Sequence, residues 1–423
     1  MKVHPMRHRP LPRSLDPLGD ESLLGYLLRL AHRAGTTPVE MAARTSLLAE
    51  TTHGNLSIFS HGFIHDLSPS RIQNFTRATS LQMREARGLL LSEYAARYGP
   101  VDISLNRSAR SPVIAANNTW VYFGSSRYCP QCLAGDGSPI QAEHGGPWKR
   151  LWRLPVVFAC LTHRCLLQSR CPGCAEPAQG SVKNHGLLVR PRDGDLHPLQ
   201  CRSSVASSGS VSSACGSRLD LIGAFGAGRE IDGCTLRALL ELQKRIVTLL
   251  TTKGRETTSS VGWLIPAGQY FVDIRALVPL IFLTWPEGRH LSATPLLAKA
   301  LDVEADRRRA AYNAARSASA KGHPSRFFSV PPADALLTGA VLGIAERLLS
   351  AENEEAAFEL LRPMIYRSFE LNSILSYHLR RMRPASVPLR AVLAVDRRYR
   401  RYGHAEISRA QVIQGHPGYI RAT

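Results

Sequence analysis

The chain has 423 residues, of which 44% are hydrophobic and 20% are charged. This length predicts two or three domains rather than a single core. The formal net charge of +20 favours a polyanionic partner, and nucleic acid ranks ahead of a membrane surface or a merely solvated basic exterior. The basic, proline-broken N-terminus and the absence of a long apolar run argue against a signal peptide and a membrane span, so we expect a cytoplasmic protein.

Two short helices are expected near the N-terminus. Asp20 is placed to cap the first helix, whose apolar residues recur every three or four positions until Gly35 ends it. Thr37, Pro38 and Glu40 then have the spacing of a capping box, with proline at the first helical position. A second helix therefore begins at this point.

The stretch from Ser68 to Gly99 predicts a further pair of helices. Ser68 caps the first, a turn follows near Ser80, and the second runs on with Arg84 and Arg87 facing outward. This arrangement is compatible with a helix-turn-helix, whose second helix enters the major groove of DNA. Periodicity does not distinguish it from a plain helical hairpin used as a scaffold or partner surface. Both interpretations stay open, with Arg84 and Arg87 as candidate DNA contacts.

Eight of the nine cysteines lie between Tyr128 and Leu219. Cysteines two residues apart aim both thiolates at one point, as tetrahedral Zn²⁺ requires. In a reducing cytosol, clustered cysteines bind metal more often than they form disulfides. We therefore predict a tandem zinc-ribbon or zinc-finger module with two structural zinc ions per chain. The expected ligands are Cys129, Cys132, Cys160 and His163 in the first site, and Cys171, Cys174, Cys201 and Cys215 in the second.

The ligands of the second site leave an alternative open, because a serine-rich insert separates Cys201 from Cys215. The residues that could replace Cys201 are Cys165, His185 and His197. Both shells are filled by protein ligands, which is typical of structural zinc, whereas catalytic zinc keeps one position open. A zinc-dependent nuclease or hydrolase is therefore only the second alternative.

Short aromatic and β-branched runs around Trp120 to Phe123 and Val156 to Cys160 predict small strands that lead into the zinc knuckles. Trp148 and Trp152 lie between the two halves of the first site. We expect both rings to form the small core that such a module needs, rather than to stack on bases.

The chain turns helical again after Leu219. Apolar faces predict helices across residues 235–250, 274–286, 331–349 and 356–382, and an alanine- and arginine-rich stretch across residues 291–320 is either a helix or a connector. Arginines beside two tyrosines near the C-terminus are suited to phosphate contacts, or to docking on an acidic protein. These candidate DNA-binding residues are Arg397, Arg398, Arg400 and Arg401.

The order YCPQCL, W…WRLP, CLTH, CPGC and CGSRL resembles the TniQ family of bacterial transposition proteins, which includes TnsD-type target selectors. The segment DESLLGYLLRLAHRAG looks like the N-terminal signature of that family. Two features depart from the family pattern. Cys165 stands where the family usually has a small residue, and the gap between Cys201 and Cys215 is wider than usual.

The resemblance implies a protein that chooses or licenses the target of a transposon. It would engage DNA or a DNA-bound complex and recruit an AAA+ ATPase of the TnsC or TniB type, which in turn directs a transposase. A CRISPR effector complex and a second copy of the chain are left open as further partners, and no membrane partner is expected.

We therefore expect a mainly α, multi-domain protein. Its domains would be a helical domain with the helix-turn-helix-like pair (residues 1–125), the tandem zinc module with short β-strands (126–222), and a helical domain with a basic arm (223–423). No Walker A sequence, HExxH, GxSxG elbow or Rossmann fingerprint is present, so we expect no enzyme. The leading hypothesis is a zinc-containing DNA-targeting adaptor, and a sequence-specific transcription regulator is the runner-up.

Overall fold

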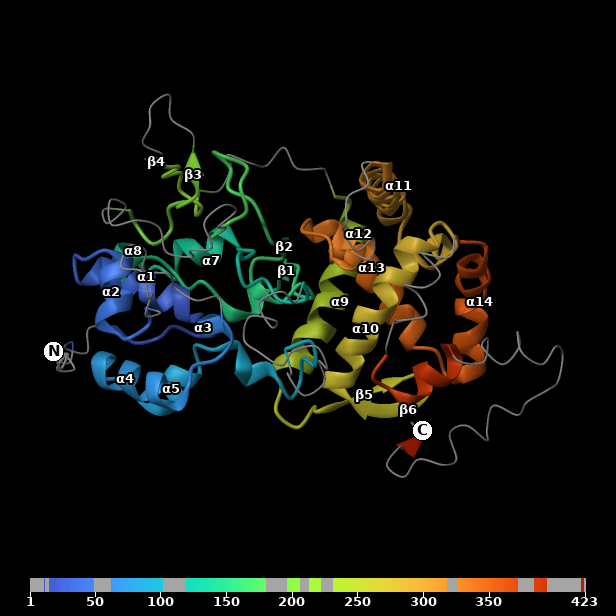
Figure 1. The fold of residues 1–423 in the computed structure, drawn as a ribbon, viewed down its shortest axis with the longest axis horizontal. Coiled ribbons are helices and arrows are strands. Elements are labelled where there is room, and N and C mark those ends of the chain that lie inside the picture. Colours follow the sequence, from blue (N-terminus) through green and yellow to red (C-terminus); the bar gives the residue numbers. More distant parts are fainter. Residues whose placement is uncertain are drawn as a thin grey trace.

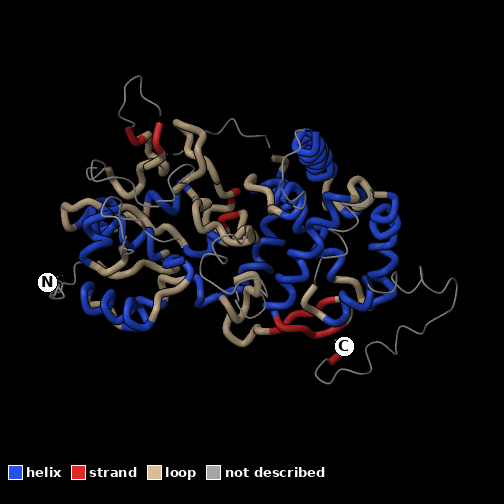
Figure 2. The backbone as a smooth tube through the Cα atoms, viewed as in Figure 1, coloured by secondary structure: helices blue, strands red, loops and turns tan. Residues whose placement is uncertain are grey.

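The fold is mainly helical, as the sequence predicts (Figures 1 and 2). The computed structural model describes residues 11, 15–48, 62–101, 119–179, 196–205, 213–221, 231–317, 326–371, 384–393 and 420–421. The N-terminal helices lie at one end of the elongated molecule and the longer C-terminal helices lie at the other, while the cysteine-rich region lies partly between them and partly above the N-terminal helices in this view (Figure 1). None of the helices among the described residues is both long and apolar enough to cross a membrane.

The N-terminal elements are α1 (Leu23–Arg33), α2 (Pro38–Arg44), α3 (Gly62–His65), α4 (Pro69–Thr79), α5 (Met83–Arg87) and the 3-10 helix η1 (Leu91–Tyr94). The capping box of α2 is confirmed, since the Thr37 and Glu40 side chains each bond the other residue's backbone N–H at 3.1 Å. Ser22, and not Asp20, caps α1: its Oγ accepts a hydrogen bond from the Gly25 N–H at 3.2 Å.

Asp20 has a different role from the predicted cap. Its backbone is left-handed, with φ of 57°, and its carboxylate accepts hydrogen bonds from the Tyr94 hydroxyl and from Arg150 Nε. The carboxylate therefore connects the start of the helical region to the cysteine-rich region. A local pattern cannot reveal this use, because both partners are distant in sequence.

The length predicted for the second helix of the α4–α5 pair is wrong. Ser68 caps α4 and the left-handed Ser80 ends it, as expected, but α5 spans only five residues and stops before Gly88. The next three residues, Leu89 to Leu91, are all buried. Gly88 is the C-cap of α5, and the chain turns there so that these leucines enter the core outside the helix. Arg84 and Arg87 are exposed, but they lie on a helix of little more than one turn.

The C-terminal elements are α9 (Gly233–Thr251), α10 (Ala267–Leu283), η4 (Arg289–Leu291), α11 (Pro295–Ser317), α12 (Arg326–Ser329), α13 (Ala335–Leu349) and α14 (Glu354–Glu370). Asp232, Asp334 and Asn353 cap α9, α13 and α14. The predicted helix at residues 274–286 begins earlier, at Ala267, and the one at 356–382 ends at Glu370 within the described residues.

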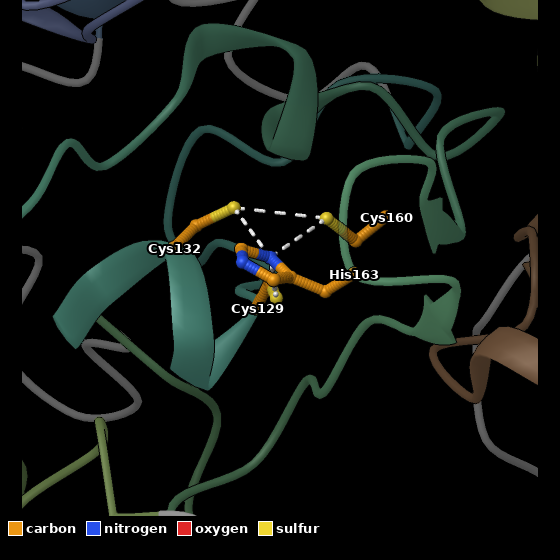
Figure 3. A group of neighbouring side chains, drawn as sticks. All are labelled: Cys129, Cys132, Cys160 and His163. Carbon is orange, nitrogen blue, oxygen red and sulfur yellow. Dashed lines mark hydrogen bonds between the residues drawn. The ribbon is translucent and has the colours of Figure 1, made fainter. Parts of the chain in front are cut away.

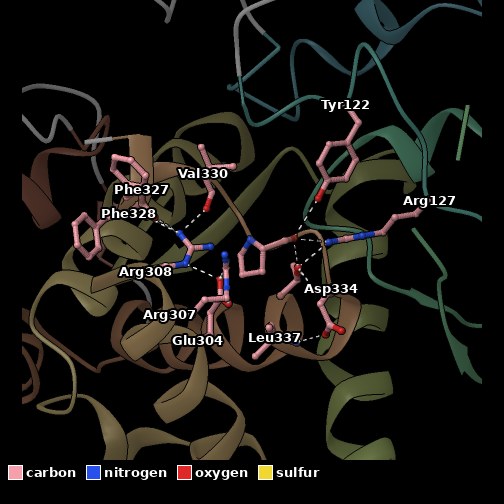
Figure 4. A network of polar contacts seen from close by, with 12 residues as sticks. Tyr122, Arg127, Glu304, Arg307, Arg308, Phe327, Phe328, Val330, Asp334 and Leu337 are labelled. Carbon is pink, nitrogen blue, oxygen red and sulfur yellow. Dashed lines mark hydrogen bonds and ion pairs between the residues drawn. The ribbon is translucent and has the colours of Figure 1, made fainter. Parts of the chain in front are cut away.

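The alanine- and arginine-rich stretch is a helix, α11, with one buried arginine. Arg308 Nε donates to Glu304 at 2.7 Å, and its Nη1 donates to the carbonyl oxygens of Phe327 and Val330 at 2.9 Å (Figure 4). Arg307 donates to the same Glu304 carboxylate at 2.7 Å. Arg308 therefore joins α11 to the segment before α13 and is not available to DNA.

Strands are few and short in the part of the chain that the structure describes. β5 (Thr257–Ser260) and β6 (Trp263–Pro266) form an antiparallel hairpin, and β7 (Ile420–Arg421) pairs with the free edge of β6. Two-residue ladders join β1 (Ala159–Cys160) to β2 (Cys165–Leu166) and β3 (Ser204–Val205) to β4 (Ser213–Ala214). The strand predicted near Trp120 does not form, because that segment is a series of turns.

The three predicted domains share one core within the described residues. The buried hydrophobic side chains form a continuous cluster that extends from Leu15 to Val392. Tyr98 packs on Phe271 of α10 with ring centroids 5.2 Å apart. A Cβ on Gly99 would lie 2.2 Å from the Gly268 carbonyl oxygen, so glycine permits this contact. The domain boundaries stay a prediction.

Candidate metal centres

The first four predicted ligands come from two short elements that face each other (Figure 3). Cys129 precedes the short helix α7 (Pro130–Ala134), and Cys132 lies within it. Pro130 is at the first helical position, so the chain turns immediately after Cys129 and brings the second thiol back toward the first. Cys160 ends β1, and His163 lies in the loop that leads to β2. We call these four residues the first tetrad.

The spacing of the first tetrad fits a tetrahedral zinc ion. His163 Nδ1 lies 3.4, 3.3 and 3.5 Å from the sulfurs of Cys129, Cys132 and Cys160, and the last two sulfurs lie 3.6 Å apart. A tetrahedral ion about 2.3 Å from sulfur and about 2.0–2.1 Å from nitrogen requires edges of about 3.8 Å between sulfurs and about 3.6 Å between nitrogen and sulfur. The donor set and its edges therefore suit zinc.

The other four predicted ligands form a second tetrad. The sulfurs of Cys171 and Cys215 lie 3.8 Å apart and those of Cys174 and Cys201 lie 3.7 Å apart, again the edges of a zinc–thiolate tetrahedron. All four donor atoms lie within 4.8 Å of one another. The serine-rich insert therefore does not keep the second half of the site apart.

Backbone pairing explains how the two distant cysteines meet. Next to the β3–β4 ladder, the Cys201 N–H donates to the Ser217 carbonyl, and the Gly216 N–H donates to the Cys201 carbonyl, both at 2.9 Å. The CPGC turn also packs closely on this segment at its glycine. A Cβ on Gly173 would lie 2.0 Å from Ser217 Oγ.

The alternative ligands do not lie at the second tetrad. Cys165 lies beside the first tetrad, where its sulfur is 3.8 Å from that of Cys129. His197 contacts the ring of His32, with centroids 4.9 Å apart, and its Nε2 lies 3.1 Å from the Glu143 carbonyl oxygen. His185 lies outside the described residues.

The pKa values of the thiols indicate that the tetrads are suited to a cation. The Cys129, Cys132 and Cys165 thiols hold the pKa of Cys160 well below its usual range, because they hydrogen-bond to its thiolate. In the second tetrad, burial raises the pKa of Cys174 to about 11. Neighbouring thiols cannot all ionise together without a cation, so each tetrad favours a metal ion that replaces the thiol protons.

Arg127 and Gln243 hold the backbone of residues 155–159, which leads directly to Cys160. Arg127 Nη1 donates to the carbonyl oxygens of Pro155 and Val157 at 2.8 and 2.9 Å. Gln243 of α9 accepts hydrogen bonds at its Oε1 from the N–H groups of Phe158 and Ala159, at 2.6 and 2.8 Å. The hairpin that carries Cys160 is thus positioned by side chains outside it.

The same arginine also reaches the C-terminal helices (Figure 4). Arg127 is fully buried, and its Nη2 donates to the Pro332 carbonyl at 2.9 Å and to Thr338 Oγ1 at 2.6 Å. Tyr122 donates to the same Pro332 carbonyl at 3.3 Å. Arg127 therefore connects the first tetrad to α13. We call the contacts of Arg127 and Gln243 with residues 155–159 the Arg127–Gln243 support.

Sequence reasoning missed both residues of this support. A signal for Gln243 exists, since it is a polar residue on the apolar face of α9 and is fully buried. Such a residue must find a hydrogen-bond partner. Trp148 and Trp152, by contrast, form the expected small core: they are 1% and 3% exposed and lie edge to face.

Of the six arginines predicted to contact DNA, the structure describes only two. Arg84 and Arg87 are exposed on α5. The four arginines of the predicted C-terminal arm, Arg397, Arg398, Arg400 and Arg401, lie outside the described residues.

Fold and site together define a mainly helical protein organised around two Cys/His clusters that are suited to metal binding. The TniQ family model matches residues 12–167, so this part of the chain carries a TniQ domain. This match encloses the whole first tetrad and ends before Cys171 of the second. No curated protein matches the chain. The TniQ domain associates the chain with target selection in transposition.

Proposed function

We propose that the chain is a zinc-containing adaptor of a Tn7-like or TniQ-type transposition system. It links target DNA, or a complex already bound to DNA, to an AAA+ ATPase and through that ATPase to a transposase. The TniQ match that encloses a complete metal-binding tetrad is the observation that carries this proposal. The net charge of +20 supports a DNA partner.

Zinc in this proposal is structural. Each tetrad supplies four protein donors, which leaves no ligand position for a substrate or a reactive water. The ions would fix the hairpins of the cysteine-rich region. The hydrogen bonds of the Arg127–Gln243 support would hold these hairpins in a fixed position relative to α9 and α13. The chain itself would carry out no chemistry, so another protein must perform each step on DNA.

The partner ATPase provides the test. We expect the purified chain to bind the AAA+ ATPase encoded near its gene, and to bind it more tightly when DNA and ATP are both present, since weak contacts on one duplex gain effective concentration. Co-purification and a DNA mobility supershift at micromolar concentrations measure this. Cys171→Ser in the second tetrad should lose this complex because the chain misfolds, and Cys234→Ser is its matched control, because Cys234 is an exposed cysteine outside both tetrads.

The contrary result is also specific. If the ATPase neither co-purifies with the chain nor supershifts its DNA complex, while the chain alone occupies its own promoter, the protein is a transcription regulator. The short α5 does not favour that alternative, because a recognition helix must present several residues along the major groove.

A further inference from the structure

A fifth side chain of a metal-ligating type lies beside the first tetrad. Cys165 Sγ is 3.8 Å from Cys129 Sγ, which equals the edge of a zinc–thiolate tetrahedron. Of the nine cysteines, three belong to the first tetrad, four form the second tetrad, and Cys234 is exposed on α9. Cys165 is therefore the one surplus thiol beside either tetrad.

The register of the β1–β2 hairpin explains why this thiol faces the tetrad. Cys160 and Cys165 are directly opposite each other in the antiparallel ladder. Side chains of directly opposite residues point to the same face and have Cβ atoms about 4.5–5.5 Å apart. Since Cys160 belongs to the first tetrad, Cys165 must point toward the tetrad as well.

The loop between these two cysteines carries the only nitrogen donor of the tetrad. His163 and Cys165 are separated by Arg164, whose backbone is left-handed with φ of 50°. A left-handed residue is found mostly in turns, so the chain reverses direction between the two donors. One short loop therefore carries both an imidazole of the first tetrad and a thiol beside it.

We propose that Cys165 is a reserve ligand of the first centre, able to complete a four-thiolate shell with Cys129, Cys132 and Cys160 when His163 does not hold the metal. On binding, the Cys165 thiol releases its proton to solvent and the imidazole of His163 leaves the ion. The inference rests on the zinc assignment made above. It adds that the first centre has two ligand sets, whereas the second centre has one.

Metal content of four variants tests the proposal. We expect about two zinc ions per chain in the natural protein, in Cys165→Ala and in His163→Ala, and about one in the double variant His163→Ala/Cys165→Ala. Cys215→Ala in the second tetrad is the matched control. It should lose one zinc ion outright, because no surplus thiol lies beside that tetrad.

Cobalt substitution gives a second readout that does not depend on stoichiometry. Cobalt(II) in the first centre of the natural protein should show the absorption of a site with three sulfurs and one nitrogen. In His163→Ala, the charge-transfer absorption from sulfur to cobalt should increase by roughly one third per site, since a fourth thiolate replaces the imidazole. His163→Gln is the milder variant if His163→Ala fails to fold.

The outcomes separate the two proposals. A natural protein that binds no zinc contradicts the zinc assignment itself. If the natural protein binds two ions and His163→Ala binds one, as the double variant does, the reserve-ligand proposal is wrong and the zinc assignment stands. A gain of thiolate absorption that persists in the double variant would also overturn the proposal.

Discussion

Two kinds of buried polar residue support the first centre, and they differ in what their loss should cost. A metal ion held by the tetrad residues would link them to one another, whereas Gln243 acts through two ordinary hydrogen bonds to the backbone. Structural zinc contributes on the order of 10 kcal/mol to folding in small modules, and a buried unpaired N–H costs about 1–3 kcal/mol. Loss of a ligand should therefore be the more severe change.

Replacing Cys129 with serine, together with Cys165→Ala so that the reserve thiol cannot substitute, removes one thiolate from the first tetrad. We expect a protein that binds one zinc ion fewer and is largely insoluble, since the hairpins around the site no longer have a common centre. Elemental analysis and the soluble yield measure this. The control Cys234→Ser should keep both its zinc content and its soluble yield. A protein that stays fully folded in the presence of chelator would contradict structural zinc.

Replacing Gln243 with leucine leaves the N–H groups of Phe158 and Ala159 without their acceptor. We expect a loss of roughly 2–5 kcal/mol in the free energy of unfolding. Chemical denaturation measures it. The same substitution at Gln73, which is exposed on α4, should change stability by less than about 0.5 kcal/mol. Equal effects at the two sites would show that the backbone of residues 155–159 does not depend on Gln243.

At the scale of elements, α10 and the segment 384–393 are joined by one buried carboxylate. Asp273 Oδ1 accepts hydrogen bonds from the N–H groups of Ala385 and Ser386 at 2.7 and 3.1 Å. Burial raises the pKa of Asp273 to about 6, and these hydrogen bonds offset only part of that effect. The fold therefore favours the protonated carboxyl.

The sign of the resulting pH dependence follows from linkage. A folded-state pKa above the unfolded value means that the protonated group contributes stability below about pH 4, and that this contribution is lost as the pH rises to about 6. Asp273→Asn does not titrate. We therefore expect the stability of the natural protein relative to Asp273→Asn to fall by on the order of 2–3 kcal/mol across this window.

Denaturation of both proteins at several pH values between 4 and 7 tests this expectation. Comparison with Asp273→Asn is necessary, because protons also compete with metal at the tetrads and that effect is common to both proteins. Parallel stability curves would mean that Asp273 stays ionised in the fold.

At the scale of the whole molecule, the excess of basic residues should make DNA binding dependent on salt. Each phosphate that a basic residue neutralises releases counterion. Replacing Arg397, Arg398, Arg400 and Arg401 with alanine should reduce the slope of log affinity against log salt by at most about 4. The matching set of arginine-to-lysine changes keeps the charge and should retain most of the slope. An unchanged slope in the alanine variant would indicate that this segment docks on protein or has no part in binding.

The parts of the fold that were predictable are those that depend on neighbours in sequence. The caps at Thr37 and Ser68 and the CxxC turns need only a few consecutive residues, and the structure has them where expected. The length of α5 was not predictable, because it depends on how Leu89 to Leu91 enter the core. Asp20 and Gln243 act on partners that are at least 74 residues away in the sequence, which no local pattern reveals.

In the candidate site, too, local features were predictable and features that depend on distant pairing were not. Ligand types and spacings indicated both tetrads, but they left open whether Cys201 or another residue meets Cys215 across the serine-rich insert. The place of Cys165 was not indicated, since it depends on the register of a two-residue ladder. A sequence pattern specifies which residues can bind metal, but the backbone pairing decides which of them meet.

The Arg127–Gln243 support also determines how the protein should respond to heat. Modules joined only by linkers melt separately, and each gives its own peak of heat absorption. Here the segment before Cys160 takes its hydrogen bonds from α9 and from an arginine anchored on α13. A chelator should therefore lower the melting temperature of the C-terminal helices together with that of the cysteine-rich region. In a calorimeter, the two regions should behave as one cooperative unit.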